Sequence, residues 1–265
     1  MNTKNVTDYL QTLHDLIPAI QMGVVPPSTG ITYNKFAGRL DIGTTQSIIS
    51  TCHNENPFNT TGTQLYISSA DATANQVIFL EGVDQNYEVK QVNIQLQGQT
   101  AIPLTTNFRT IWRGYNNDST DLTGDAYVGS EATPTDGVPA DENMYCNIIS
   151  IINGKLVNQT LTSIFTIPKG YNGFVTSWYC SAPKSADIDF TAYIREKDKV
   201  FRYVERMALY QTSFKKDLPF IRIPEFADIK VMGATQNANY NGTTIYDLTL
   251  VSKDYLNKIR RLDFR

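Results

Sequence analysis

Histidine and cysteine, the side chains that most often carry acid–base, nucleophilic or metal chemistry, are scarce in this chain. The 265 residues contain two histidines, His14 and His53, and three cysteines. Neither histidine has a partner at the spacing of a zinc site or a catalytic triad. The chain also lacks a glycine-rich phosphate loop, a dinucleotide-binding fingerprint and a nucleophile elbow. We therefore predict no catalytic, cofactor-binding or metal-binding residues, and a protein that is not an enzyme.

An acidic stretch resembles the start of a calcium loop, with Asn116, Asp118 and Thr120 at alternating positions. The match fails at two places that the calcium geometry needs. Asp121 stands where a glycine makes the sharp turn, and Tyr127 stands where a glutamate binds the metal through both oxygens. The pattern therefore favours a solvated linker over a metal site.

Two further groups have side chains that are capable of chemistry. Glu205 lies inside an aromatic strand, where a carboxylate is either a general acid or a residue that faces water. Trp112, Tyr115, Trp178 and Tyr179 form a sugar-stacking platform only if their rings are exposed together, and aromatic residues in strands usually fill cores. Trp178 and Tyr179 are kept as candidate glycan-binding residues.

The cysteines and the overall charge indicate where the protein folds and what it does not bind. Cys52, Cys146 and Cys180 are odd in number and lie in apolar or strand-like surroundings, which favours reduced, structural thiols and a reducing cytoplasm. A net charge of −3 gives no general attraction to nucleic acid or anionic lipid. No apolar run is long enough to cross a membrane, and no signal peptide is evident. We expect a soluble protein with neither a nucleic-acid nor a membrane partner.

The first 39 residues differ from the rest of the chain and are predicted to form an N-terminal helix and an extended arm. Apolar residues recur at helical spacing from Val6 to Ile17, and Pro18 lies near the predicted helix end. The segment from Gly23 to Ala37 has too few apolar residues to bury itself. The arm folds back on its own domain or docks on a neighbouring subunit. Its candidate partner-binding residues are Tyr9, Leu10, Leu13, Leu16, Ile17, Pro26 and Pro27.

The remaining sequence predicts a mainly β protein with two β-sandwich or jelly-roll-like domains. Threonine and aromatic residues suit strands, and asparagine, glycine and proline suit the turns between them. The polar stretch from Asn116 to Asn143 is the expected boundary. The first domain is expected at 40–129, a linker at 130–143, and the second, jelly-roll-like domain with a basic C-terminal tail at 144–265.

Two hairpins are predicted from alternating apolar residues. The first joins the strand around Ile78 to the strand containing Val92, and a bulge near Lys90 is expected because Val89 and Val92 are three residues apart. The second joins Ile188–Arg195 to the strand that begins near Val200.

Several segments resemble structural proteins of tailed bacteriophages, especially marine ones. In the first half these are Ile78 to Val89, Gln95 to Thr100 and Thr106 to Arg113. In the second half they are Thr166 to Gly170, Val175 to Trp178, Ile223 to Glu225 and Asp228 with Ile229. The likeness covers about residues 75–235 and includes no catalytic signature.

The resemblance implies a non-enzymatic virion protein, assembled in the host cytoplasm and present in many symmetric copies. The leading hypothesis is a capsid decoration or cement subunit that self-associates, for example as a trimer, and binds the major capsid protein. A tail or neck component is the nearest alternative. A receptor- or glycan-binding module on the virion surface is a third, and it requires exposed Trp178 and Tyr179 rings.

Overall fold

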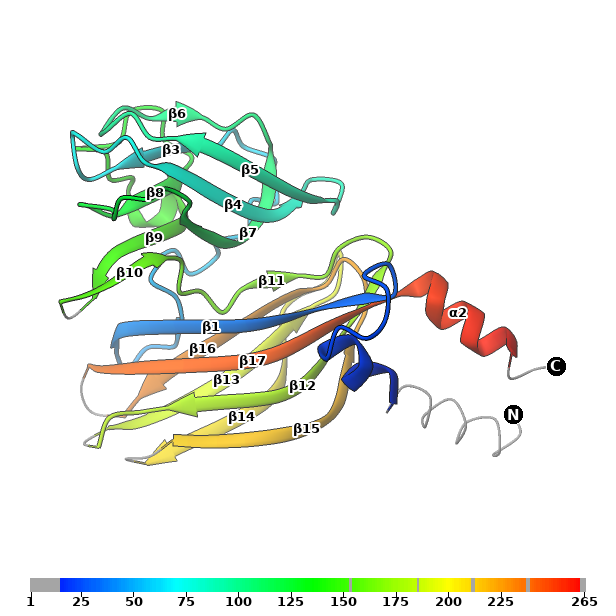
Figure 1. Ribbon diagram of the computed structural model, residues 1–265. Coiled ribbons are helices and arrows are strands. Elements are labelled where there is room, and N and C mark those ends of the chain that lie inside the picture. Colours follow the sequence, from blue (N-terminus) through cyan, green and yellow to red (C-terminus); the bar gives the residue numbers. More distant parts are fainter. Residues whose placement is uncertain (1–14, 153, 185, 211–212, 237–238, 263–265) are drawn as a thin grey trace.

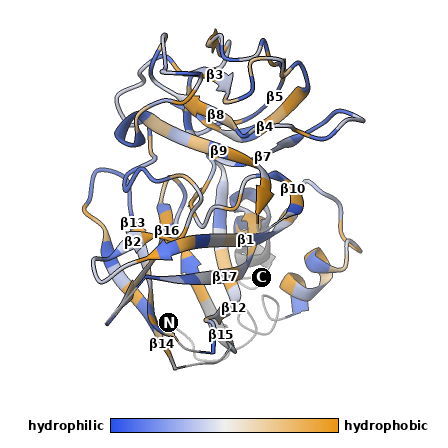
Figure 2. Ribbon diagram, turned by 90° about the vertical axis from the view of Figure 1, so that its left-hand side faces the viewer, coloured by the Kyte–Doolittle hydropathy of each residue, from blue (hydrophilic) through white to orange (hydrophobic). Residues whose placement is uncertain are grey.

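The computed structural model describes residues 15–262, apart from 153, 185, 211–212 and 237–238. Within this part the chain is mainly β, as the sequence predicts, and it forms two stacked β domains (Figure 1). A view turned by 90° also places one domain above the other, with hydrophilic and hydrophobic residues mixed along the strands (Figure 2).

The lower domain is a sandwich of two sheets. One is four-stranded, in the order β1 (Gly30–Ile42), β17 (Tyr240–Ser252), β12 (Tyr171–Ser181) and β15 (Ser213–Ile223). The other has the order β11 (Phe165–Thr166), β16 (Asp228–Thr235), β13 (Asp187–Arg195) and β14 (Arg202–Tyr210), and β2 (Ser47–Ile48) also pairs with β16.

The chain changes sheet at every connection of this sandwich except two: the β13–β14 hairpin, and the passage from β2 to β11, which both pair with β16. Eight strands joined in this way make the two interlocked Greek keys of a jelly roll. Ile188, Phe190, Trp178 and Leu248 fill the space between the sheets and are almost fully buried. We call this lower part the jelly-roll domain.

The upper domain, here called the inserted domain, is one sheet that curls around its own core. Its eight strands follow the order β5 (Val89–Gln95), β4 (Val77–Asp84), β7 (Phe108–Asn116), β10 (Lys155–Gln159), β9 (Met144–Ile152), β8 (Ala126–Gly129), β3 (Tyr66–Ser69) and β6 (Ile102–Pro103). A short 3-10 helix, Asp141–Asn143, precedes β9. Leu80, Phe108 and Ile148 lie in the core enclosed by this sheet.

These domain limits correct the ones expected from the sequence. β1 lies in the jelly roll, although the sequence predicts an arm over most of its length, and β8 lies inside a sheet, although the sequence predicts a domain boundary there. The strand at Met144–Ile152 belongs to the inserted domain rather than to the second sandwich. The reason is topological: the inserted domain interrupts the jelly roll between β2 and β11, and both of these short strands pair with β16.

The N-terminal helix, residues 15–21, and the C-terminal helix α2 (Lys253–Leu262) lie at one end of the jelly roll (Figure 1). Leu16, Ile17 and Ile20 form one apolar cluster with Phe174 and Leu256. The described part of the N-terminal helix therefore folds back on its own domain. Neither helix, over its described residues, has the length and apolar character that a bilayer crossing requires.

The structure confirms the β13–β14 hairpin and corrects the other hairpin. β13 and β14 pair through the tight turn at Glu196, where the Lys199 amide donates to the Glu196 carbonyl at 3.0 Å. β4 and β5 also form a hairpin, but their register runs unbroken from Val77 to Val83, so the bulge predicted near Lys90 is wrong. Val89 instead points outward and is 41% exposed.

Gly82 provides a test of how tightly the inserted sheet is packed. A Cβ atom at this position would lie 1.9 Å from the backbone oxygen of Thr110, where β4 and β7 shift register. Because backbone cannot yield as a side chain can, we expect Gly82→Ala to lower the free energy of unfolding by about 3 kcal/mol. Gly38→Ala is the matched control, since its nearest neighbour would lie 3.8 Å away, and its effect should stay below about 1 kcal/mol. Urea denaturation of both variants measures the difference, and equal effects would contradict this packing.

Candidate assembly interface

One buried carboxylate joins the two domains. Asp228 at the start of β16 accepts hydrogen bonds from Arg195 of β13, at 2.9 and 2.7 Å, and from Arg109 of β7, at 3.0 Å. Its other oxygen accepts a bond of 2.7 Å from Thr166 Oγ1, which itself lies 2.7 Å from Thr110 Oγ1 of β7. The side chain of Asp228 is only 1% exposed, so the ion pairs form almost without water.

Aromatic rings cover the two arginines. The guanidinium carbon of Arg195 lies 5.1 Å from the ring centre of Phe58 and 4.4 Å from that of Phe201. The guanidinium carbon of Arg109 lies 4.8 Å from the ring centre of Tyr87. Cations stacked on ring faces gain from the ring quadrupole and are shielded from solvent. This shielding strengthens the bonds to Asp228.

A second junction lies between β1 and β7. Lys35 is buried and its Nζ donates to the backbone oxygen of Trp112. The Trp112 ring stacks on Phe165 of the jelly roll, with 4.3 Å between ring centres. Tyr33, two residues before Lys35, donates a hydrogen bond of 3.3 Å to Oε1 of Glu81 in β4. Burial lowers the pKa of Lys35 to about 7, because little water remains to solvate the charged amine.

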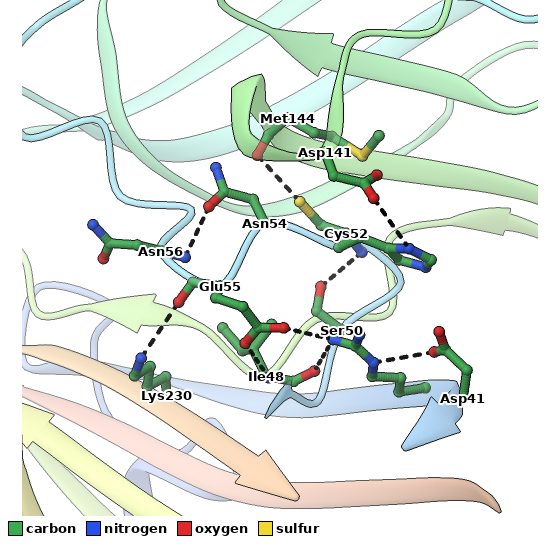
Figure 3. A network of polar contacts seen from close by, with 12 residues as sticks. Asp41, Ile48, Ser50, Cys52, Asn54, Glu55, Asn56, Asp141, Met144 and Lys230 are labelled. Carbon is green, nitrogen blue, oxygen red and sulfur yellow. Dashed lines mark hydrogen bonds and ion pairs between the residues drawn. The ribbon is translucent and has the colours of Figure 1, made fainter. Parts of the chain in front are cut away.

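The segment that leaves the jelly roll after β2 is held to both domains (Figure 3). Glu55 accepts a bond from the Ile48 amide at 2.8 Å and pairs with Arg39 at 3.1 Å. On the other side, Cys52 Sγ lies 3.3 Å from the Met144 oxygen, and Asn54 donates to the Glu142 oxygen at 3.0 Å. The two domains therefore meet through a fixed connection.

A groove runs between the domains along the free edge of β1. Its first part has a volume of about 330 Å³ and is bordered by five consecutive residues of β1, from Thr32 to Phe36, opposite Arg113 and Gln159. The side chains of consecutive strand residues point to opposite faces of a sheet. A hollow that contacts five consecutive residues must therefore lie along the edge of the strand. The next part, of about 500 Å³, shares Phe36 and Gln159 with the first and continues along β1 to Leu40. We call the two parts together the edge groove.

Backbone groups of β1 face this groove. The Ser252 amide donates to the Thr29 oxygen at 2.9 Å, and the β1–β17 register then continues unbroken from Gly30 to Arg39. Backbone groups of an antiparallel strand alternate between its two edges. The N–H and C=O groups of Thr32, Asn34, Phe36 and Gly38 therefore point away from β17. β1 is an edge strand of its sheet, and these groups lie along the groove.

Apolar side chains from both domains gather at the second part of the groove. Phe36 and Leu40 of β1 are 41% and 48% exposed, and Leu156 of β10 is 59% exposed. Ile151 of β9, at 50% exposed, lines the adjoining hollow, which shares Leu40 with the groove. Large apolar side chains gathered at one exposed place are typical of surfaces that contact another molecule, so this part of the groove is the candidate interface.

The four predicted arm residues that the structure describes do not form one surface. Leu16 and Ile17 are buried against Phe174 in their own domain, and Pro26 and Pro27 are exposed in the turn before β1. Tyr9, Leu10 and Leu13 lie outside the described residues.

The predicted glycan platform is corrected. Trp178 is 2% exposed and its ring nitrogen donates to Thr244 Oγ1 at 2.7 Å, so its ring faces cannot stack on a sugar. Tyr179 is half-buried and, as the next residue in β12, points to the opposite face of the sheet. Trp112 is also fully buried.

The acidic loop, His53 and Glu205 are the remaining candidates from the sequence. Asn116 donates to the Thr120 oxygen at 2.6 Å, and Asp118 accepts from the Ser119 amide at 2.7 Å, so the acidic loop closes on itself. Among the described residues no three His, Cys, Asp or Glu side chains are placed to hold a metal ion. His53 is exposed, with Nδ1 3.9 Å from Asp141, and Glu205 is half-buried on β14.

The prediction of reduced, structural cysteines is confirmed. All three thiols are free and buried. Burial raises the pKa of Cys52 and of Cys180 to about 12, and it raises the pKa of Cys146 further. Thiols of this kind are unreactive at neutral pH.

The residues that join the domains were not found from the sequence. Asp228, Arg109 and Arg195 come from three separate strands, and Lys35 lies in a segment assigned to an arm. One signal was available: Arg109 and Asp228 are charged residues next to strongly apolar stretches, where a charge needs a partner.

Comparison with known proteins places the chain in no family. No family model matches the sequence, and no curated protein matches it. A structure of infectious bursal disease virus, Gt strain, can be superposed on 88% of this chain. The match covers 77% of the viral chain, with 12% sequence identity and a TM-score of 0.22. T=1 particles derived from the same virus overlap 89% and 74%, with 11% identity and a TM-score of 0.24. An isomalto-dextranase of Arthrobacter globiformis T6 complexed with panose overlaps 84% and 35%, with 9% identity and a TM-score of 0.22. Overlaps at such TM-scores carry no inference, and the tailed-phage resemblance stays a prediction.

The Asp228 junction predicts a large loss of stability on neutralisation. Asp228→Asn leaves the half-buried Arg109 and Arg195 without the buried carboxylate that pairs with both, so we expect the free energy of unfolding to fall by about 3 kcal/mol. Glu196→Gln removes the exposed pair with Arg202 and should cost less than about 1 kcal/mol. Chemical denaturation compares the two variants, and a small effect at Asp228 would mean that the junction is not tightly held.

Lys35 predicts a pH dependence of stability. Between about pH 7, its pKa in the folded chain, and 10.5, its ordinary pKa, the unfolded chain binds more protons than the folded chain. The free energy of unfolding therefore rises with pH in this window, by up to ~1.4 kcal/mol per pH unit from this group. Below about pH 7 both states are protonated and the contribution is constant.

Denaturation of wild type and Lys35→Met over about pH 7 to 9.5 tests this. The wild-type curve should rise more steeply than that of the variant, and Lys155→Met, at an exposed position, should keep the wild-type slope. Equal slopes for wild type and Lys35→Met would show that the lysine is not held in an uncharged state.

Proposed function

We propose that this chain is a non-enzymatic structural protein of a virion, which assembles with copies of itself and with other virion proteins. The observation that carries the proposal is the jelly-roll connectivity of the lower domain with a second β domain inserted between β2 and β11. Jelly rolls occur in viral capsid proteins and also in lectins and cupins. The interior of this jelly roll favours a structural role, as in a capsid protein, over ligand binding.

A jelly roll that binds a small ligand between its two sheets needs a hollow there, lined by polar or aromatic groups. Between these two sheets the cavity lined by Trp178, Val175 and Ile194 has only about 30 Å³, room for about one water molecule. Two of the buried titratable groups are engaged in structural bonds: Asp228 holds two arginines, and Lys35 holds the backbone of β7. These features support a role in assembly rather than in catalysis.

Within the virion we propose a position on the outside of the capsid, as a decoration or cement subunit made in the host cytoplasm. A net charge of −3 gives no general attraction to a packaged genome, which supports an external position. Exposed apolar residues on the edge groove support contacts with other protein subunits. A tail or neck subunit would use the same contacts at another place.

Labelling of intact particles tests the proposal. Antibodies raised against the purified chain should bind to particles in electron micrographs, and the chain should co-sediment with particles through a density gradient. Label over the capsid shell supports decoration, and label confined to one vertex or to the tail supports the alternative. A chain found only in the unassembled protein of infected cells would overturn the proposal. A matched antibody against an unrelated host protein measures background.

A further inference from the structure

We propose that the edge groove receives the first fourteen residues of a neighbouring copy of this chain. The inference rests on the proposed function, because it names the partner that the groove would bind during assembly. Residues 1–14 lie outside the described part of the chain. The remaining segments outside it contain one to three residues each.

The apolar residues of this segment belong to a helical pattern that continues into the described helix, where its apolar residues lie in a core. Leu16, Ile17 and Ile20 pack against Phe174 and Val251 of their own jelly roll. Tyr9, Leu10 and Leu13 precede them at helical spacing, on the same predicted stripe. The apolar surface at this end of the domain is thus covered by Leu16, Ile17 and Ile20. The preceding apolar residues would be buried on another surface.

The edge groove offers that surface at the opposite end of the molecule. The described chain begins beside α2, whereas the apolar part of the groove lies towards the far end of β1, next to β10 (Figure 1). A contact between one end of a copy and the other end of the next is head-to-tail; repeated, such contacts form a ring where the rotation between copies closes and an open filament where it does not. Fourteen residues reach ~46 Å when extended and ~21 Å as a helix, enough to pass from one subunit to the next.

The groove matches such a segment in chemistry. Phe36, Leu40 and Leu156 are exposed apolar side chains that would contact Tyr9, Leu10 and Leu13. The outward backbone groups of β1 are available to hydrogen-bond the main chain or polar side chains of the incoming segment. A copy that fills the groove would cover these apolar side chains, which are otherwise exposed to water.

Disulfide trapping between two variants tests the proposal. Leu10→Cys in one preparation and Leu156→Cys in another are mixed in equal amounts and oxidised. The native thiols are buried, so the introduced cysteines are the reactive ones. We expect cross-linked dimers in this mixture and their loss when Leu156→Cys is replaced by Val200→Cys, an exposed control position outside the groove. Leu13→Cys repeats the test nearly one helical turn further along.

Each other outcome overturns the inference. Cross-linking at Val200→Cys equal to that at Leu156→Cys would show unspecific collision. A cross-link that forms only inside the double variant Leu10→Cys/Leu156→Cys would show that the segment fills its own groove. No cross-link from either Leu10→Cys or Leu13→Cys, with the melting temperature of each variant unchanged, would show that the groove has another occupant.

The particle-labelling experiment separates this inference from the proposed function. Particles that contain the chain, together with a failed cross-link, overturn the groove contact alone. Cross-linked dimers of a chain that is absent from particles overturn the virion role and leave the contact in place.

Discussion

The arrangement of the two domains depends on the cost of burying the charge of Asp228. A carboxylate with 1% of its side chain exposed is tolerable only when opposite charges and hydrogen bonds replace water. Arg195 and Thr166 supply part of this replacement from the jelly roll, and Arg109 supplies the rest from the inserted domain. The carboxylate is fully compensated only when both domains are in place, so the junction links the folding of one to the position of the other.

The inserted domain leaves the jelly roll intact because it enters and leaves at one place. Ser50 and Thr162 form an antiparallel bridge, the Ile49 amide donates to the Val231 oxygen, and the Ser163 amide donates to the Ile49 oxygen. To the jelly roll, the more than one hundred residues between Thr51 and Leu161 act as a loop whose ends are already together. Loop-closure entropy grows only slowly with length, so such an insertion is tolerated.

Local patterns predicted local structure, and long-range pairings could not be found from one sequence. The alternation around Ile188 and Phe190 predicts the β13–β14 hairpin because the two strands are adjacent in sequence. β1 pairs Gly30 with Val251, and no local pattern of β1 indicates that partner. The predicted bulge assumed that Val89 must point inward, yet an edge strand tolerates one exposed valine.

For the candidate interface, composition and spacing predicted little of what the structure contains. The scarcity of histidine and the spread of the cysteines led to the prediction that the chain is not an enzyme, and this stays a prediction. The residues of the edge groove are unremarkable in sequence: Phe36, Leu40 and Leu156 matter because β1 and β10 meet at the junction of two domains. The sequence does not distinguish an exposed tryptophan from a buried one, and Trp178 is buried.

The bridge between Ser50 and Thr162 has an evolutionary consequence. A domain whose two ends lie side by side can be exchanged for another with equally close ends, provided that the new one supplies a cation where Arg109 meets Asp228. The jelly roll can thus remain constant while the part above it diversifies.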